Sequence, residues 1–476
     1  MRPEFLRSKP HSPWKEPGAA NRPRGALFRQ TAAVALAVMI ADAGLGAASA
    51  ASIVRDAETE ALIKTYLAPI FKVAGIRSEN RQVFLIPNQS FNAFVADGSK
   101  IFVNVGAVVT SETPGELIGV LAHETAHVAH GDLGRLKQQM ATARNAALIA
   151  SLIGIGAVAA GAAAGVGGLA QAGSSLMYGS QTAAQRSVLS YRRGQESEAD
   201  REAVKYLDKT GQSGAGMLKT LERFASDTLF LSRNVNPYVL SHPLPRERIV
   251  ALEEIVKRSP HYGRTDPPDL LRRHKMVQAK LVGFTWSPDK IDRRYSRNDK
   301  GREARYARAI AAYLHGPLPP ALKLIDGLIQ SEPDNPYFWE LKGQAILERG
   351  KPAESIAPLR QAVTLAPKSG LIRILLGQAL VATEKPGNLD EAIENLSLGL
   401  QAEPDVSVGY RALARAHALQ GDIAMAELAT AQGYFTDGEI RDAKGHAARA
   451  QSKLKRGSPA WLRADDIVSY QPPKIR

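Results

Sequence analysis

The stretch His123-Glu124-Thr125-Ala126-His127 decides the fold of this chain, because it forms an H-E-x-x-H motif. Ahead of it, Thr113-Pro114-Gly115-Glu116 has the pattern of a helix start, with a capping box and proline at the first helical position. Gly131 is placed to end that helix. Two histidines four residues apart lie on one face of a helix, where both imidazoles can bind one zinc ion and Glu124 lies beside the metal-bound water. A histidine pair on a solvated helix is the alternative.

A catalytic zinc site needs a third protein ligand and a fourth position for water. The chain has no cysteine, so that ligand is a histidine or a carboxylate. His130 lies on the same helix, and Leu133 stands where a metzincin requires its third histidine, which rejects that class. A better candidate is Glu196-Ser197-Glu198-Ala199-Asp200, in which Glu196 and Asp200 share one helix face. One carboxylate can bind the metal while the other orients a ligand histidine, although an isolated acidic helix is more typical of a solvated surface.

A third segment, His242-Pro243, precedes a predicted helix. The following proline favours an extended conformation for His242. His242 can donate to the developing oxyanion or approach the open zinc position, and a structural loop histidine is the alternative.

Composition restricts the remaining possibilities. The chain has 476 residues, 44% hydrophobic and 23% charged, which is a globular balance. The absence of cysteine excludes disulfide scaffolds, thiol nucleophiles and iron–sulfur sites held by cysteine. The net charge of +14 suits anionic membranes or acidic partners without identifying either. Residues 1–50 place a basic segment before an apolar run and Ala48-Ser49-Ala50, which predicts a cleaved signal peptide, with a retained anchor as the alternative.

The C-terminal part is repetitive. Gly343-Gln344-Ala345 recurs as Gly377-Gln378-Ala379, and Pro333 and Pro367 are also 34 residues apart. This period predicts three to four tetratricopeptide repeats over 301–440 and a capping helix near 440–455, with a generic helical bundle as the alternative. Residues 258–300 are expected to form a connector with a short helix or strand, and residues 456–476 a C-terminal tail.

Two further segments bear on substrate and membrane contact. Residues 145–185 contain no charged side chain, and we expect a buried or surface-lying helical hairpin beside the active site; a membrane span and a lid are the alternatives. Residues 101–105 alternate like a half-buried strand and directly precede the metal-binding helix. We expect an edge strand there that pairs with an extended substrate.

These segments, together with Asn92-Ala93-Phe94-Val95, resemble in content and order the zinc metallopeptidases related to the CAAX prenyl endoprotease. The predicted repeats make the chain similar to the exported branch of that family, and the resemblance covers nearly all of residues 51–450. It implies an α+β, mostly helical fold. A zincin-type (gluzincin) metallopeptidase domain with a small sheet would occupy 51–257, and an α-solenoid of tetratricopeptide repeats would occupy 301–455.

The resemblance also implies roles for single residues. It assigns one zinc ion per chain to His123, His127 and Glu196, and the general base to Glu124. By the same resemblance, Asp200 would orient His123, and His242 would be a flexible residue near the metal. Arg193 would pair with a carboxylate near the site. Asp132 and Arg192 depart from the residues that relatives often carry at these positions, and we expect neither to contact the metal ligands.

The implied function is an exported, periplasmic zinc endopeptidase that degrades misfolded or stalled envelope proteins, with membrane association as an open possibility. The repeats would dock clients or the outer-membrane assembly machinery. Contact with a membrane surface is a further possibility, and no nucleic acid is expected as a partner. One alternative is a periplasmic chaperone or scaffold in which the repeats bind partners and proteolysis is latent. Another is an integral membrane protease anchored by residues 146–170.

Overall fold

The computed structural model describes residues 53–77, 82–96, 100–164, 167–230, 237–244 and 246–472. The predicted signal peptide lies outside the described residues. The described chain is mostly helical with one small sheet, as expected, and all described elements lie within one compact unit, residues 52–476.

The sheet has three strands, β1 (Gln82–Ile86), β2 (Ala93–Ala96) and β3 (Lys100–Asn104), in the order β1-β3-β2. β3 pairs in parallel with β1 and antiparallel with β2. The prediction that residues 101–105 form an edge strand is therefore wrong, because β3 is the central strand. Alternating hydrophobicity shows that one face of a strand is buried, but it carries no information about how many neighbours the strand has.

In the described part of the chain up to residue 258, eight helices accompany the sheet, and helix α4 carries the H-E-x-x-H motif. Leu117, Val120 and Leu121 of α4 are buried, and α4 packs against α6 and α7. The helices are α2 (Ala57–Val73), α3 (Val105–Thr110), α4 (Pro114–His130), α5 (Asp132–Ala164), α6 (Gly167–Lys209), α7 (Ala215–Phe230), α8 (Pro237–Ser241) and α9 (Arg246–Arg258).

The ends of α4 follow the sequence signals only in part. Proline occupies the first helical position, and Gly131 ends the helix with a φ of 67°, a left-handed conformation that glycine adopts without strain. The capping box does not form, because the Thr113 side chain makes no capping hydrogen bond. Glu116 instead accepts a hydrogen bond from the backbone N–H of Glu112.

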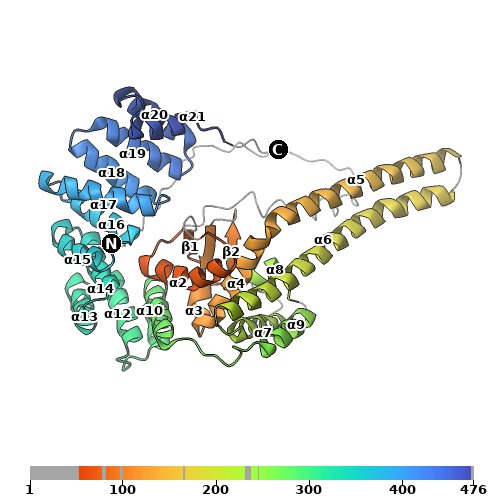
Figure 1. The fold of residues 1–476 in the computed structure, drawn as a ribbon, viewed down its shortest axis with the longest axis horizontal. Helices are drawn as coiled ribbons and strands as arrows, with labels where there is room; N and C mark the ends of the chain where they lie inside the picture. Colours follow the sequence, from red (N-terminus) through yellow and green to blue (C-terminus); the bar gives the residue numbers. More distant parts are fainter. Residues whose placement is uncertain are drawn as a thin grey trace, which may run out of the picture. The chain divides into compact units, whose positions relative to one another are not determined.

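Residues 145–185 fall within a helical hairpin formed by α5 and α6, which run alongside each other (Figure 1). The expectation of a hairpin is confirmed, but its described distal side chains are not buried: Leu148 is 53% exposed and Leu152 is 68% exposed. Among the described residues, no helix combines the length and hydrophobicity that a membrane span requires.

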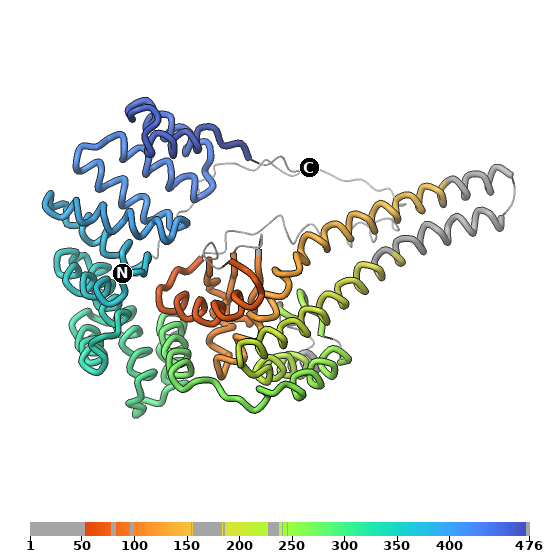
Figure 2. Tube along the Cα trace, in the orientation of Figure 1, coloured from red at the N-terminus to blue at the C-terminus, as the bar shows by residue number. Residues whose placement is uncertain are grey.

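The C-terminal part consists of consecutive helix pairs, which can be followed by residue number in Figure 2. A 3-10 turn, η1 (Pro386–Asn388), lies between α16 and α17. The tetratricopeptide assignment of these pairs stays a prediction. The helices are α12 (Arg302–His315), α13 (Leu318–Ser331), α14 (Pro336–Glu348), α15 (Pro352–Leu365), α16 (Gly370–Ala382), α17 (Leu389–Ala402), α18 (Ser407–Leu419), α19 (Ile423–Thr436), α20 (Ile440–Lys453) and α21 (Pro459–Ser469).

The connector and the tail are more structured than expected. Residues 258–300 contain α10 (Pro268–Thr285) and α11 (Pro288–Arg294), and α10 packs against α2, α3 and α12. α21 lies in the predicted tail, where Ala464 and Ile467 are buried against α19 and α20. One hydrophobic core runs from Leu62 to Ala345, so the first helix pairs share a core with the sheet and its helices.

Candidate metal centre

Four side chains from three segments converge at one point. His123 and His127 come from α4, Glu196 from α6, and His242 from the residue after α8. One donor atom of each lies within 4.8 Å of the donor atoms of the others. His123, Glu196 and His242 are buried, and His127 is half-buried. Among the described residues, this is the one group with the composition and spacing to hold a metal ion.

The distances between these donor atoms fit a tetrahedral cation. Zinc bonds of about 2.0–2.1 Å at tetrahedral angles place neighbouring donor atoms about 3.3 Å apart. The Nε2 atom of His123 lies 3.0 Å from Nε2 of His127 and 3.4 Å from a Glu196 oxygen, and His127 Nε2 lies 3.6 Å from the other Glu196 oxygen. The Nδ1 atom of His242 takes a fourth place, 3.4 Å from His123 Nε2 and 3.1 Å from Glu196.

Two carboxylates fix the tautomers of the paired histidines. Asp200 lies 2.9 Å from Nδ1 of His123, and Asp132 lies 2.6 Å from Nδ1 of His127. We therefore assign the ring proton to Nδ1 in the neutral form of each histidine, the form that binds a metal. Both Nε2 lone pairs then face each other, an arrangement that is repulsive without a cation between them and suits a metal ligand pair.

The contact of Asp132 corrects one expectation. We expected Asp132 not to touch the metal set, but it pairs directly with the ligand His127. Asp132 begins α5 directly after Gly131 has ended α4. The short turn therefore carries its carboxylate back onto the last turn of the metal-binding helix. The other departure, Arg192, donates to the Ser241 carbonyl beside His242.

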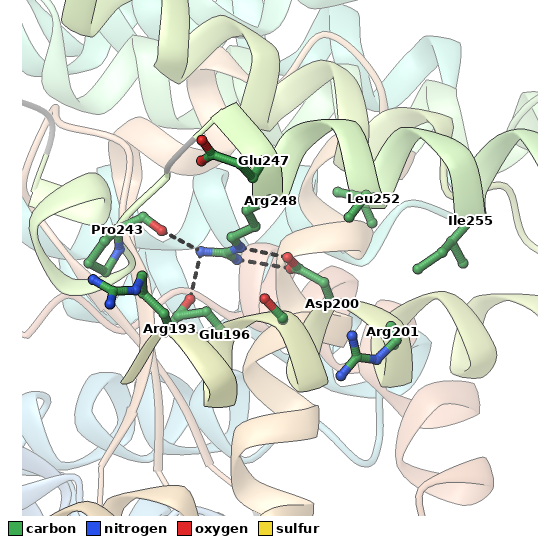
Figure 3. Close-up of a pocket in the computed structure, with 11 residues that line it drawn as sticks. Arg193, Glu196, Asp200, Arg201, Pro243, Glu247, Arg248, Leu252 and Ile255 are labelled. Carbon is green, nitrogen blue, oxygen red and sulfur yellow. Dashed lines mark hydrogen bonds and ion pairs between the residues drawn. The ribbon is translucent and has the colours of Figure 1, made fainter. Parts of the chain in front are cut away.

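Arg248 contacts two acidic residues of α6, Glu196 and Asp200, as Figure 3 shows. Its guanidinium lies 2.7 Å from a Glu196 oxygen and makes two hydrogen bonds of 2.5 and 2.9 Å to Asp200. A further bond of 3.0 Å reaches the Pro243 carbonyl, next to His242. Arg248 thus connects a metal ligand, the carboxylate that orients His123 and the loop that carries His242.

The pKa shifts differ among the three histidines: positive charge is stabilised on His123 but not on His127 or His242. Burial alone would lower the pKa of His123, but the carboxylates of Asp200 and Glu196 raise it to about 9. Burial would raise the pKa of Asp200, but Arg248 and His123 hold it at about 2. Burial lowers the pKa of His242 to about 4 against the opposing effect of Glu196, so this imidazole is neutral at neutral pH.

Glu124 is set apart from the donor atoms but faces the same space. Its Oε1 atom is buried without a hydrogen-bond partner among the described residues, and it lies 3.3 Å from Nε2 of His242. Burial raises the pKa of Glu124 to about 8. A carboxylate with an unsatisfied oxygen and a pKa near neutrality is suited to accept a proton and release it again.

Arg193 does not join this cluster. It is exposed, makes no hydrogen bond or ion pair with the described residues, and lines a pocket of about 370 Å³ beside Arg248 (Figure 3). The role that the resemblance implies for Arg193 stays a prediction. Arg248 makes the contacts with carboxylates that the sequence analysis expected of Arg193.

A cleft of about 580 Å³ opens onto the metal centre. Glu124, His127, Glu196 and His242 line its floor. Phe94 and Val95 of the edge strand β2 line it as well, together with Leu133, Leu136 and Lys137 at the base of α5. A free strand edge beside a donor cluster suits an extended peptide.

A helix with the H-E-x-x-H motif, a carboxylate from a second helix and a cleft beside a strand edge together define a metalloprotease. Residues 56–256 match the model of peptidase family M48.

Curated relatives extend the similarity beyond that domain. The chain is 24% identical over 390 residues to the beta-barrel assembly-enhancing protease of Yersinia pestis, covering 80% of this chain and 77% of the relative. It is 26% identical over 385 residues to the protein of that name from Escherichia coli strain K12, covering 80% and 76%. A putative beta-barrel assembly-enhancing protease of Vibrio cholerae is 26% identical over 261 residues, covering 54% and 52%.

Sequence reasoning identified the converging residues but missed two that orient them. Arg248 stands six residues after His242, and Asp132 two residues after His130. The sequence signal for both is weak, because a charged residue in the first turn of a helix is common on any solvated surface.

Proposed function

We propose that this chain is a zinc-dependent endopeptidase of the bacterial envelope that cleaves misfolded or stalled envelope proteins. The observation that carries the proposal is the tetrahedral spacing of His123, His127 and Glu196, with the buried Glu124 carboxylate alongside. The names of the relatives, which concern β-barrel assembly, support the envelope and its proteins as the setting.

The metal would be held by His123, His127 and Glu196. When bound, zinc lowers the pKa of a coordinated water to about 7 and polarises a carbonyl. Glu124 accepts the proton of the attacking water at its unpaired Oε1 and passes it to the leaving amine nitrogen. In the neutral imidazoles, Asp200 and Asp132 hold the ring proton on Nδ1 and so leave Nε2 available to the metal, and Arg248 forms an ion pair with Glu196.

Substrate backbone would bind along the edge of β2 rather than along β3. Among the described strands, β2 has a neighbour on one side only, so the N–H and C=O groups on its outer edge can pair with an extended segment, which selects for unfolded chain more than for sequence. Phe94 and Val95 of this strand line the cleft, so a paired segment would pass over Glu124.

His242 gives a specific reason to keep a second candidate function. With a metal bound, its Nδ1 atom would take the fourth position that a catalytic water needs, and hydrolysis would then require His242 to move. A resting site closed in this way is compatible with a chaperone or scaffold whose proteolysis is latent. In that case the repeats, which would dock clients or the assembly machinery, perform the main task.

The Glu124→Gln variant tests the first proposal and separates it from the second. Glutamine keeps the shape but cannot accept the proton, so we expect zinc content near one ion per chain and loss of peptide cleavage. Retained cleavage would exclude this mechanism. If full-length Glu124→Gln fully complements a deletion strain, so that the wild-type phenotype returns, the scaffold function is favoured. The full chain is required because the first helix pairs share a core with the sheet domain.

A further inference from the structure

The α5–α6 hairpin has an unusual charge distribution. Between Asp132 and Glu196 the sequence contains six Lys or Arg residues and no Asp or Glu. All six lie near the base of the hairpin, and residues 145–185 carry no charge. The six are Arg135, Lys137 and Arg144 on α5 and Arg186, Arg192 and Arg193 on α6.

One face of α5 changes from basic to apolar toward its distal end. Lys137, Arg144, Leu148, Leu152 and Ile155 follow one another at intervals of seven, four, four and three residues, which places them in one stripe along the helix. All five are exposed. The three apolar ones are 53%, 68% and 51% exposed, and the neighbouring Ile149 and Ile153 are exposed too, although α5 packs on α6. Exposed large apolar side chains in a contiguous stripe indicate a contact surface.

The charges favour an anionic lipid surface over a second copy of the chain. A second copy would bring another hairpin with six cations and no anion, and the like charges would repel each other. Lipid phosphates complement these cations. The distal part of the hairpin is uncharged, so it can enter the acyl region without burying a charge. From Arg144 to Ile155 the helix rises about 16 Å, close to one half of the hydrocarbon thickness of a bilayer.

We propose that the α5–α6 hairpin is an interfacial anchor: Leu148, Leu152 and Ile155 enter the headgroup–acyl boundary of an anionic membrane while Arg144 and Arg186 contact lipid phosphates. The anchor does not span the bilayer, in keeping with the absence of a span-forming helix among the described residues. Because the base of α5 also lines the cleft, anchoring brings the cleft close to the membrane surface.

Vesicle flotation of the mature chain tests this anchor. We expect the chain to float with phosphatidylethanolamine vesicles that contain phosphatidylglycerol and to bind much less to vesicles without it. The combined variant Leu148→Ser, Leu152→Ser, Ile155→Ser should lose flotation. The matched control is Leu419→Ser, Ile423→Ser, Leu462→Ser, which removes three similarly exposed apolar residues of the C-terminal helices and should float like the parent. Arg144→Gln with Arg186→Gln should weaken binding roughly 25-fold at low salt, about fivefold for each cation.

A fluorescent label locates the contact, because the chain has no cysteine and Leu152→Cys creates a unique attachment point. An environment-sensitive dye at this position should shift to shorter wavelength on anionic vesicles, and the same dye at Leu419→Cys should not. Flotation that survives the Leu148–Ile155 variant, or an unshifted dye at position 152, would overturn the proposal. Concentration-dependent dimers that disappear in that variant, without flotation of the parent, would instead assign the stripe to a second copy. The outcome is independent of catalysis, since Glu124→Gln should float normally.

Discussion

Replacing Asp132 should weaken metal binding without preventing folding. Asp132 accepts a hydrogen bond of 2.6 Å from Nδ1 of His127 and so orients this ligand and increases its basicity. We expect the dissociation constant for zinc to rise about tenfold in Asp132→Asn and up to about a hundredfold in Asp132→Ala. The amide oxygen of asparagine can still accept the bond, whereas alanine removes it.

The size of this effect follows from the surroundings of the pair. Removing an outer-shell partner of a zinc ligand costs about 10–100-fold in affinity, or about 1.4–2.7 kcal/mol. The loss is near 100-fold where the carboxylate interacts with the histidine alone. Asp132 also pairs with the half-exposed Arg135 at 2.8 Å, which neutralises part of its charge and places the asparagine variant at the lower end.

Competition with a chromogenic zinc chelator measures this change. Glu202→Gln is the matched control, because Glu202 is an acidic residue of α6 that pairs only with the exposed Lys205 among the described residues. Its zinc affinity should equal that of the parent. Unchanged affinity in Asp132→Ala would refute the reasoning, since it would show that the Asp132–His127 contact contributes nothing to ligand orientation. Unfolding temperatures of the zinc-free proteins would separate metal binding from loss of fold.

Two further predictions concern stability. Burial lowers the pKa of His274 to about 4, although a hydrogen bond to the Ser111 carbonyl acts to raise it. Below pH 6.5 the unfolded chain therefore binds more protons than the folded chain. As a result, the free energy of unfolding falls as the pH decreases from about 6.5 to 4. His274→Gln should reduce this loss by up to about 3 kcal/mol, measured by urea unfolding at neutral and acidic pH; an unchanged pH dependence would contradict it. Gly343→Ala would place a Cβ atom 2.4 Å from Leu359 and should destabilise the fold by about 1–3 kcal/mol. In contrast, Gly445→Ala should stabilise the fold slightly, because its Cβ would meet only the Arg449 side chain, at an ordinary contact distance of 3.8 Å. Equal melting temperatures for both glycine variants would contradict the close helix approach.

The metal ligands were accessible to sequence reasoning because their spacing is a local property. His123 and His127 share a helix face by helical periodicity alone, and the carboxylate pair of Glu196 and Asp200 follows the same rule. The 34-residue recurrence is equally local, and Gly343 lies against Leu359 where the period places a small residue.

The predictions that were wrong concern contacts between segments that lie far apart in the sequence. The alternation of β3 could not reveal its second neighbour, and so the edge was assigned to the wrong strand. Nor could the local sequence of residues 258–300 reveal that helix α10 packs against α2, α3 and α12. The capping residues before α4 compete with long-range partners, since Glu116 pairs with Lys219 and Arg223 of α7.

By itself, the sequence determined which chemical groups are present and which of them share a helix face, because covalent geometry and helical periodicity operate over a few residues. It also determined the charge distribution of the hairpin, which is a matter of composition. Only the tertiary structure decided that His242 takes the fourth donor position and that Arg248 joins Glu196 to Asp200. These contacts depend on how α4, α6 and α9 pack, and that packing results from many small, non-local apolar contacts that no single segment encodes.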